Sequence, residues 1–219
     1  MRTPSQNIVG GALFFGLVAL LIVYFFYDEA ALRKLISQSE TPKVQLEEAT
    51  LAISEGRPDV AVKIYENLSK SGNSDAQFHL ANLYLAGKYG LKKDAQKAVG
   101  LYEQSAKAGS HAAKAELGHL FFNGEDIGQD FVKARMWLEQ AANGGSARAT
   151  YELGELWKNG WGGDKNLPMA YAWLEIAAQQ KYEPAILARD ELLKSLSPDQ
   201  VAEGQSLVGK LKADVQNSG

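Results

Sequence analysis

The 219-residue sequence contains no cysteine and only three histidines, His79, His111 and His119. Without cysteine the chain has no disulfide, no thiolate metal ligand and no thiol nucleophile. Positive charge is also modest, because the formal net charge is -3 and Arg2 is the only charged side chain before Asp28. Such a mildly acidic chain lacks the basic surface that wraps nucleic acid, and we expect no nucleic-acid partner.

Side chains with catalytic chemistry do not gather into any motif along the sequence. The three histidines are scattered without metal-ligand spacing, and no G-x-S-x-G segment is present for a serine nucleophile. The glycine-rich segment from Gly160 to Lys165 lacks the pattern of a phosphate loop, and no strand precedes it. We therefore predict that the chain is not an enzyme and that it uses no cofactor or metal.

The longest apolar run lies near the N-terminus. Residues 8–27 are uncharged and apolar apart from glycines and tyrosines. A helix of about 20 such residues spans a hydrocarbon core of about 30 Å. The bulky aromatic cluster at residues 24–27 is typical of an interfacial belt, whereas a cleaved signal peptide, the main alternative, would end in small residues. We predict a short tail at residues 1–7 and an uncleaved transmembrane helix at residues 8–27, which contacts membrane lipid.

The charges that flank this segment leave its orientation nearly undecided. The leading side offers the α-amino group and Arg2, and the trailing side offers Arg33, Lys34 and Lys43. Ala12 and Gly16 form a small-x-x-x-small pair that would permit weak self-association through the transmembrane helix, although small residues are common in such helices. Residues 28–41 are mainly polar, with apolar residues at helical spacing, which predicts a helical stalk or linker.

Self-similarity at a fixed period decides the architecture of the remaining chain. Two sets of alanines recur with spacings of 37, 36 and 36 residues: Ala61, Ala98, Ala134 and Ala170, and Ala76, Ala113, Ala149 and Ala185. Glycines recur in the same way at Gly87, Gly124 and Gly160. A repeat of this length predicts stacked helix pairs, each of which buries its apolar face only against its neighbours.

The repeated residue types indicate where each helix begins and ends. The three glycines can end the first helix of each pair in a left-handed conformation. The N-cap residues of the second helices are predicted to be Asp94, Asp130 and Asn166. Gly109 and Gly145 repeat the stop after the second helix, whereas Lys181 takes that place in the third unit.

These units resemble the Sel1-like repeat, a relative of the tetratricopeptide repeat. The resemblance is carried by Leu117-Gly118, Phe121, Lys133-Ala134, Trp137 and Ala141-Ala142, and it covers three units from Ala76 to Lys181. Residues 45–72 resemble a plainer tetratricopeptide unit. The resemblance implies an all-α fold, an α-solenoid of Sel1-like helix pairs at residues 42–195 behind a single N-terminal transmembrane helix. A polar closing helix and tail are expected at residues 196–219.

In tetratricopeptide-like arrays the first helices line the concave surface, so the resemblance implies a partner-binding site there. The positions that flank the buried core are Phe78, His79, Asn82, Leu85, Glu116, His119, Phe122, Tyr151, Glu152, Glu155 and Lys158. Aromatic anchors beside polar groups suit a peptide groove. The alternative is that Phe78, Phe122 and Tyr151 pack between units. The repeated Lys and Asn pattern that would imply recognition of a free C-terminus is absent.

The resulting functional hypothesis is a scaffold or adaptor that binds protein partners. We expect a single-pass protein of the bacterial inner membrane, with its repeat domain in the periplasm, that organises an inner-membrane or envelope complex. The first alternative is an envelope chaperone or translocon-associated factor that holds unfolded chains transiently. A glycan-binding or glycan-processing protein is a further alternative, but the sequence lacks the paired carboxylates that glycan processing would need.

Overall fold

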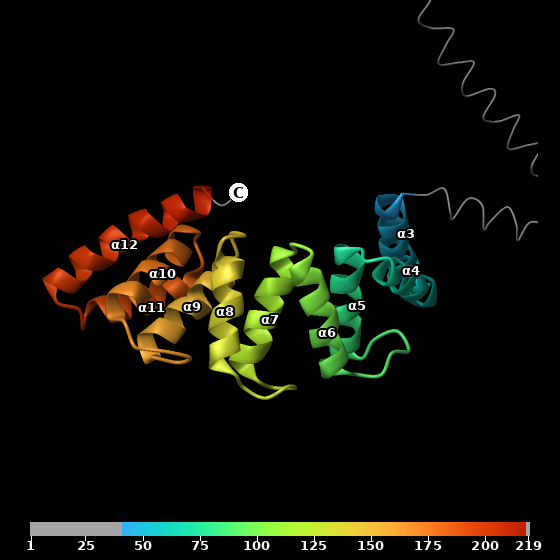
Figure 1. Ribbon diagram of the computed structural model, residues 1–219, viewed down its shortest axis with the longest axis horizontal. Coiled ribbons are helices and arrows are strands. Elements are labelled where there is room, and N and C mark those ends of the chain that lie inside the picture. The colour runs from blue at the N-terminus through green and yellow to red at the C-terminus, as the bar shows by residue number, and fades with distance from the viewer. Residues whose placement is uncertain (1–40, 218–219) are drawn as a thin grey trace, which may run out of the picture.

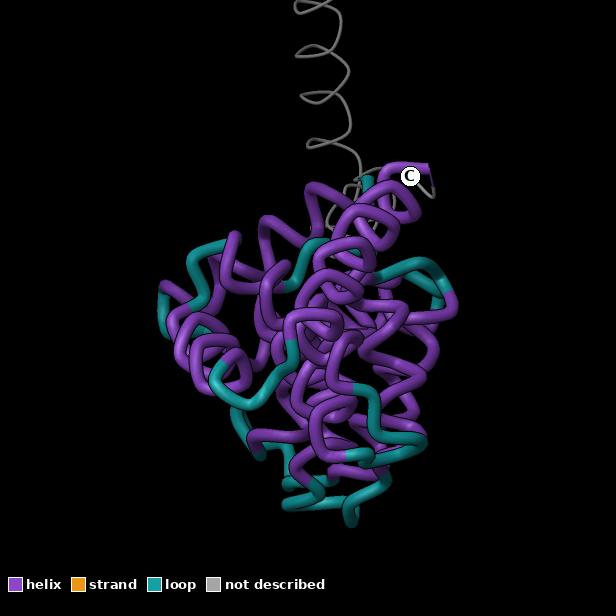
Figure 2. The backbone as a smooth tube through the Cα atoms, turned by 90° about the vertical axis from the view of Figure 1, so that its left-hand side faces the viewer, coloured by secondary structure: helices purple, strands orange, loops and turns teal. Residues whose placement is uncertain are grey.

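The computed structural model describes residues 41–217, and within them all regular structure is helical. The helices are α3 (Pro42–Ser54), α4 (Pro58–Lys70), α5 (Ser74–Ala86), α6 (Ala95–Lys107), α7 (His111–Asn123), α8 (Phe131–Ala142), α9 (Ala147–Asn159), α10 (Leu167–Gln179), α11 (Glu183–Leu193) and α12 (Pro198–Asn217). Figure 1 shows them as one elongated row, and Figure 2 shows the same helices joined by loops when viewed along that row. This arrangement confirms the predicted all-helical solenoid.

The predicted tail at residues 1–7, the transmembrane helix at residues 8–27 and nearly all of the stalk lie outside the described residues. Among the helices of residues 41–217, none combines the length and the apolar character that crossing a bilayer requires. The membrane anchor therefore stays a prediction from the sequence.

Close packing within each helix pair depends on small residues, glycine and alanine. A Cβ atom added to Gly118 of α7 would lie 2.6 Å from Cγ of Leu138 on α8. At Gly154 of α9 the same atom would lie 2.8 Å from Cγ of Leu174 on α10. Ala134 is fully buried, as are its counterparts in the other units. These small residues let the two helices of a pair approach closely.

The predicted helix ends are also confirmed. The glycines after α5, α7 and α9 are left-handed, with φ of 61°, 71° and 74° at Gly87, Gly124 and Gly160. The side chains of Asp94, Asp130 and Asn166 accept hydrogen bonds from backbone N–H groups three residues later, at 2.9, 3.0 and 2.8 Å. Lys181 has a φ of 62°, so this lysine takes the left-handed turn that glycine provides after α6 and α8.

The last helix closes the array by lying across α10. A Cβ atom on Gly204 would come within 2.5 Å of the Tyr171 ring, so α12 approaches α10 very closely at that point. Leu211, further along α12, packs against the main hydrophobic core. At the other end of the row, α3 exposes Val44 and Leu51.

Candidate partner-binding site

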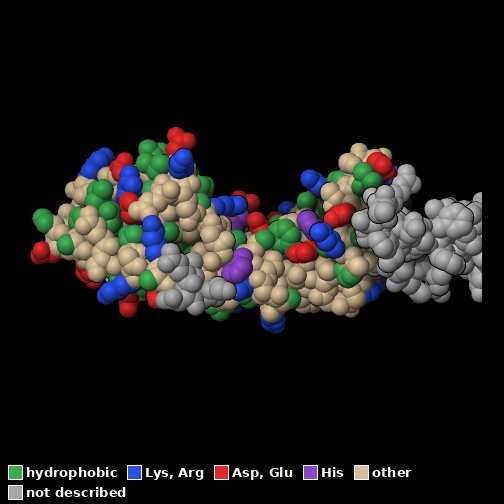
Figure 3. Space-filling view, turned by 90° about the horizontal axis from the view of Figure 1, so that it is seen from above, with side chains coloured by type: hydrophobic (Ala, Val, Ile, Leu, Met, Phe, Trp, Pro, Cys, Tyr) green, Lys and Arg blue, Asp and Glu red, His purple; other side chains and the backbone are tan. Residues whose placement is uncertain are grey.

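The first helices of the three central pairs lie on the inner side of the curved array. Helix α7 contacts α9 directly, whereas the second helices α8 and α10 have no comparable contact in the described part of the chain. Helices α5, α7 and α9 each span 13 residues, so a position in one helix has a counterpart in each of the others. Figure 3 shows a surface that is hollowed between the two ends of the array, with charged and histidine side chains around the hollow.

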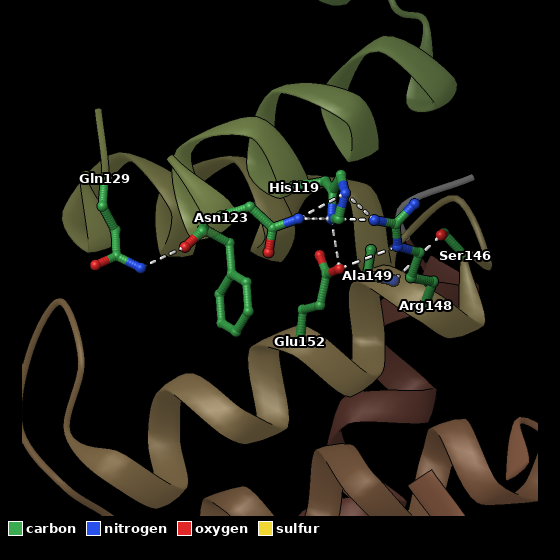
Figure 4. Close-up of polar contacts among 8 residues, drawn as sticks. His119, Asn123, Gln129, Ser146, Arg148, Ala149 and Glu152 are labelled. Carbon is green, nitrogen blue, oxygen red and sulfur yellow. Dashed lines mark hydrogen bonds and ion pairs between the residues drawn. The ribbon is translucent and has the colours of Figure 1, made fainter. Parts of the chain in front are cut away.

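The best-defined polar cluster of this inner face joins α7 to α9. His119 Nδ1 lies 2.7 Å from Glu152 Oε1, and Arg148 Nε donates to the same oxygen at 3.0 Å. Asn123 Nδ2 lies 2.9 Å from His119 Nε2, and Arg148 also contacts the histidine ring (Figure 4). A neutral His119 with its proton on Nδ1 can donate to Glu152 and accept from Asn123 at the same time. The cluster therefore connects two successive repeats.

Because the Glu152 carboxylate is buried, it depends on partners within the protein. The side chain of Glu152 is only 7% exposed, and its second oxygen, Oε2, has no hydrogen-bond partner among the residues that the structure describes. A buried carboxylate requires a paired cation to remain charged. Arg148 supplies that cation from one turn earlier on the same helix. The sequence analysis named His119 and Glu152 but missed Arg148, although its i, i+4 spacing from Glu152 was a usable signal.

A second polar contact lies within the α5–α6 pair. The hydroxyl of Tyr102, a fully buried residue, donates to Asn82 Oδ1 at 2.6 Å. Burial raises the pKa of Tyr102, and the negative charge of Glu116 raises it further. The amide nitrogen of Asn82 makes no hydrogen bond with any residue that the structure describes. Tyr102 was not among the predicted residues, although it stands where the other two repeats have a core leucine, Leu138 and Leu174.

The three predicted aromatic residues are half-buried, and each contacts another ring. Ring centroids lie 5.8 Å apart for Phe78 and Tyr102, 6.0 Å for Phe122 and Phe131, 6.1 Å for Phe122 and Trp161, and 5.5 Å for Tyr151 and Tyr182. Such pairs stabilise the contacts between neighbouring elements. Each ring also keeps an exposed portion. Partner binding and packing between units therefore both stay open for these three residues.

The remaining predicted residues are distributed over the same helices. His79 is stacked on Tyr65 with a centroid separation of 5.2 Å, and burial lowers its pKa. Lys158 Nζ donates to Glu155 Oε1 at 2.5 Å on α9. Leu85 is partly buried against the main core. Within residues 41–217, no three His, Asp or Glu side chains are grouped to hold a metal ion.

Comparisons with known proteins agree with this architecture. The model of the Sel1 repeat matches residues 74–110, 111–146 and 147–182, which contain the three central helix pairs. The crystal structure of a Sel1 repeat protein from Oxalobacter formigenes is 31% identical to the chain over 58% of its length and 95% of that protein, with a TM-score of 0.52.

A second crystal structure is that of a protective antigen of uropathogenic Escherichia coli strains displaying an SLR fold. It is 22% identical, with a TM-score of 0.48, over 80% of this chain and 46% of the antigen. The comparison with curated proteins finds no match. The repeat matches, together with the near-complete coverage of the Oxalobacter formigenes protein, show that the chain belongs to the Sel1 repeat family.

Proposed function

We propose that this chain is a scaffold or adaptor that binds a protein partner on the inner face of α5, α7 and α9. Sel1 repeat proteins are generally protein-interaction scaffolds, and their fold is typically non-catalytic. The observation that carries the proposal for this chain is that two polar side chains of that face have hydrogen-bonding groups without a partner in the described chain. Among the described residues, the Asn82 amide nitrogen and the half-buried Glu116 carboxylate make no hydrogen bond. A bound polypeptide offers the groups that both side chains lack.

The proposal extends to the cellular setting. An apolar segment at residues 8–27 would anchor the chain in a bacterial inner membrane and hold the repeat array in the periplasm, next to the envelope complex that it organises. The support is the length and the uncharged composition of that segment. The runner-up is an envelope chaperone, which would use the same inner face for many unfolded chains.

Site-specific photocrosslinking in native membranes tests the binding face. A photoreactive phenylalanine replaces Ala112, which is exposed on α7 one turn before Glu116, and the matched control replaces Val132, which is 66% exposed on the second helix α8. We expect one stoichiometric protein adduct from position 112 and none from position 132. Many weak adducts would favour the chaperone, and equal crosslinking from both positions would refute the inner face as the binding site.

The topology has a separate test. Alkaline phosphatase fused after Gly219 should be active, because this enzyme matures only outside the cytoplasm. A fluorescent protein that folds in the cytoplasm, fused at the same position, should stay dark. The reverse result would place the array on the cytoplasmic side and reject the periplasmic proposal while leaving the scaffold proposal intact.

A further inference from the structure

The repeats allow one junction between first helices to be compared with the next. At the α7–α9 junction, Glu152 of α9 accepts from Arg148 in its own helix and contacts His119 of the preceding first helix. The carboxylate thus has one cation in the same helix and one polar neighbour across the junction. Equivalent positions one repeat earlier define the α5–α7 junction, because α5, α7 and α9 have the same length.

At the α5–α7 junction the carboxylate is kept but its cation is missing. Glu116 of α7 corresponds to Glu152, Asn82 of α5 corresponds to His119, and Ala112 stands in the place of Arg148. Glu116 is half-buried, and no ion pair or hydrogen bond of its side chain is found among the described residues. A partly desolvated carboxylate without a cation gains free energy when a ligand supplies one.

The neighbouring donor is held in place for the same ligand. The buried Tyr102 hydroxyl donates to Asn82 Oδ1 at 2.6 Å, which fixes the amide and leaves its nitrogen for another acceptor. Burial raises the pKa of Tyr102, and the charge of Glu116 raises it further, so the hydroxyl keeps its proton and stays a donor to Asn82. Glu116 and Asn82 therefore offer a negatively charged acceptor and a neutral donor at the two positions that contact each other at 2.7 Å in the next pair of first helices, as Glu152 and His119. A polypeptide with a basic side chain offers the complement of both, a cation and a main-chain carbonyl.

We propose that Glu116 and Asn82 form a subsite for an arginine side chain in an extended segment of the protein partner. The guanidinium pairs with Glu116 in the place that Arg148 occupies at the next junction, and Asn82 donates to a main-chain carbonyl of the same segment. Tyr102 acts as a positioning residue for Asn82. Asp75, exposed on α5 at the position that corresponds to Ala112, adds negative charge to the approach. This inference rests on the proposed function and names the chemistry that its partner must carry.

A selection with random 12-residue peptides displayed on phage, using the full chain in detergent micelles, tests the subsite. We expect the selected peptides to share one arginine. Synthetic copies in which citrulline replaces that arginine, which keeps the shape and removes the charge, should bind about tenfold or more weakly. A lysine in its place should restore part of the affinity, because it keeps the charge without the planar fork.

Variants of the chain test whether the arginine of the peptide binds at Glu116. Glu116→Gln should weaken the arginine peptide about tenfold and leave the citrulline peptide unchanged. Ala112→Arg should compete for Glu116 and weaken the same peptide, whereas Val132→Arg on the outer face is the matched charge control and should have no effect. Tyr102→Phe keeps the ring but releases Asn82, so it should weaken both peptides alike. Circular dichroism of each variant checks that the helices are intact.

The possible results separate the two proposals. Peptides that lose affinity with Phe122→Ala or Tyr151→Ala but not with Glu116→Gln overturn the arginine subsite and leave the inner-face scaffold standing. Peptides that prefer citrulline or an acidic residue at the shared position also overturn the subsite. A selection in which no inner-face substitution affects any peptide, or which gives no binder, overturns the proposed function as well.

Discussion

Replacing Gly118 by alanine separates close helix packing from helix propensity. Alanine in a helix interior is favoured over glycine by about 1 kcal/mol, so an unhindered substitution stabilises the fold. At Gly118 the new Cβ atom would lie 2.6 Å from both Cγ and Cδ2 of Leu138, against the 3.4 Å at which ordinary contact begins. Leu138 is fully buried, so its side chain cannot relieve the clash by swinging into solvent.

The two effects can be weighed against each other. Overpacking of a well-packed core costs about 1–3 kcal/mol. The backbone nitrogen of Leu138 is also only 3.2 Å from the added atom, so relief requires α8 itself to shift, which favours the upper half of that range. After the gain in helix propensity, we expect a net destabilisation of about 1–2 kcal/mol. For an array of this size that lowers the melting temperature by about 2–8 °C.

Gly100 provides the matched control for this measurement. It lies inside α6, and a Cβ atom added there meets nothing within 4 Å. Gly100→Ala should therefore raise the melting temperature of the full chain, followed by far-ultraviolet circular dichroism, while Gly118→Ala lowers it. If both substitutions stabilise equally, α7 and α8 do not approach as closely as the structure shows.

Three further predictions concern stability and the aromatic residues. Ala134→Leu should destabilise the fold by about 1–3 kcal/mol, measured by thermal unfolding, because Ala134 is fully buried between helices. His79 has a pKa that burial holds below 6.5, so the unfolded state takes up its proton first, and stability should fall as the pH drops below about 6.5 and level off beneath the folded-state pKa. His79→Gln should flatten that dependence in denaturant titrations at several pH values. Phe122→Ala should lower thermal stability before it lowers partner recovery in a pull-down if the ring packs between Phe131 and Trp161, and the opposite order would support a binding role.

Helix ends were predictable from the sequence because their causes are local. An Asp or Asn three residues before a backbone N–H, or a glycine at a left-handed turn, acts within one turn of helix. This is why Asp94, Asp130 and Gly124 behave as the sequence indicates. Lys181 shows the limit of such rules, since its left-handed φ of 62° is imposed by the array and not by the residue itself.

The inner face was only partly predictable, because its contacts join residues far apart in the chain. The sequence placed His119 and Glu152 on first helices, but their 2.7 Å contact depends on how α9 stacks on α7. Tyr102 belongs to a second helix, and its bond to Asn82 spans 20 residues of sequence. A search limited to the positions that flank the buried core on the first helices does not find such a residue.

The repeats share the residues that pack the helices together and differ in the residues that face the hollow. Exchanging one inner-face residue between repeats therefore tests whether that residue serves the fold or the partner. Arg148→Ala would give the α7–α9 junction the pattern of the α5–α7 junction. It removes the cation of Glu152, a residue that is 5% exposed, and we expect a loss of about 1–3 kcal/mol in the free energy of unfolding. The loss stays below that of a fully buried pair because Arg148 is itself 45% exposed.

Ala112→Arg makes the reverse exchange. It adds a cation one turn before the half-buried Glu116, and an i, i+4 pair of this kind contributes about 0.3–0.5 kcal/mol or less. The unfolding free energy should therefore stay the same or rise slightly, although the same variant binds the arginine peptide more weakly. If Glu152 needs its cation for the fold while Glu116 is reserved for a partner, denaturant titrations show a loss of stability for Arg148→Ala and none for Ala112→Arg. Equal destabilisation by both would mean that the α5–α7 junction is packed as tightly as its neighbour and holds no space for a ligand side chain.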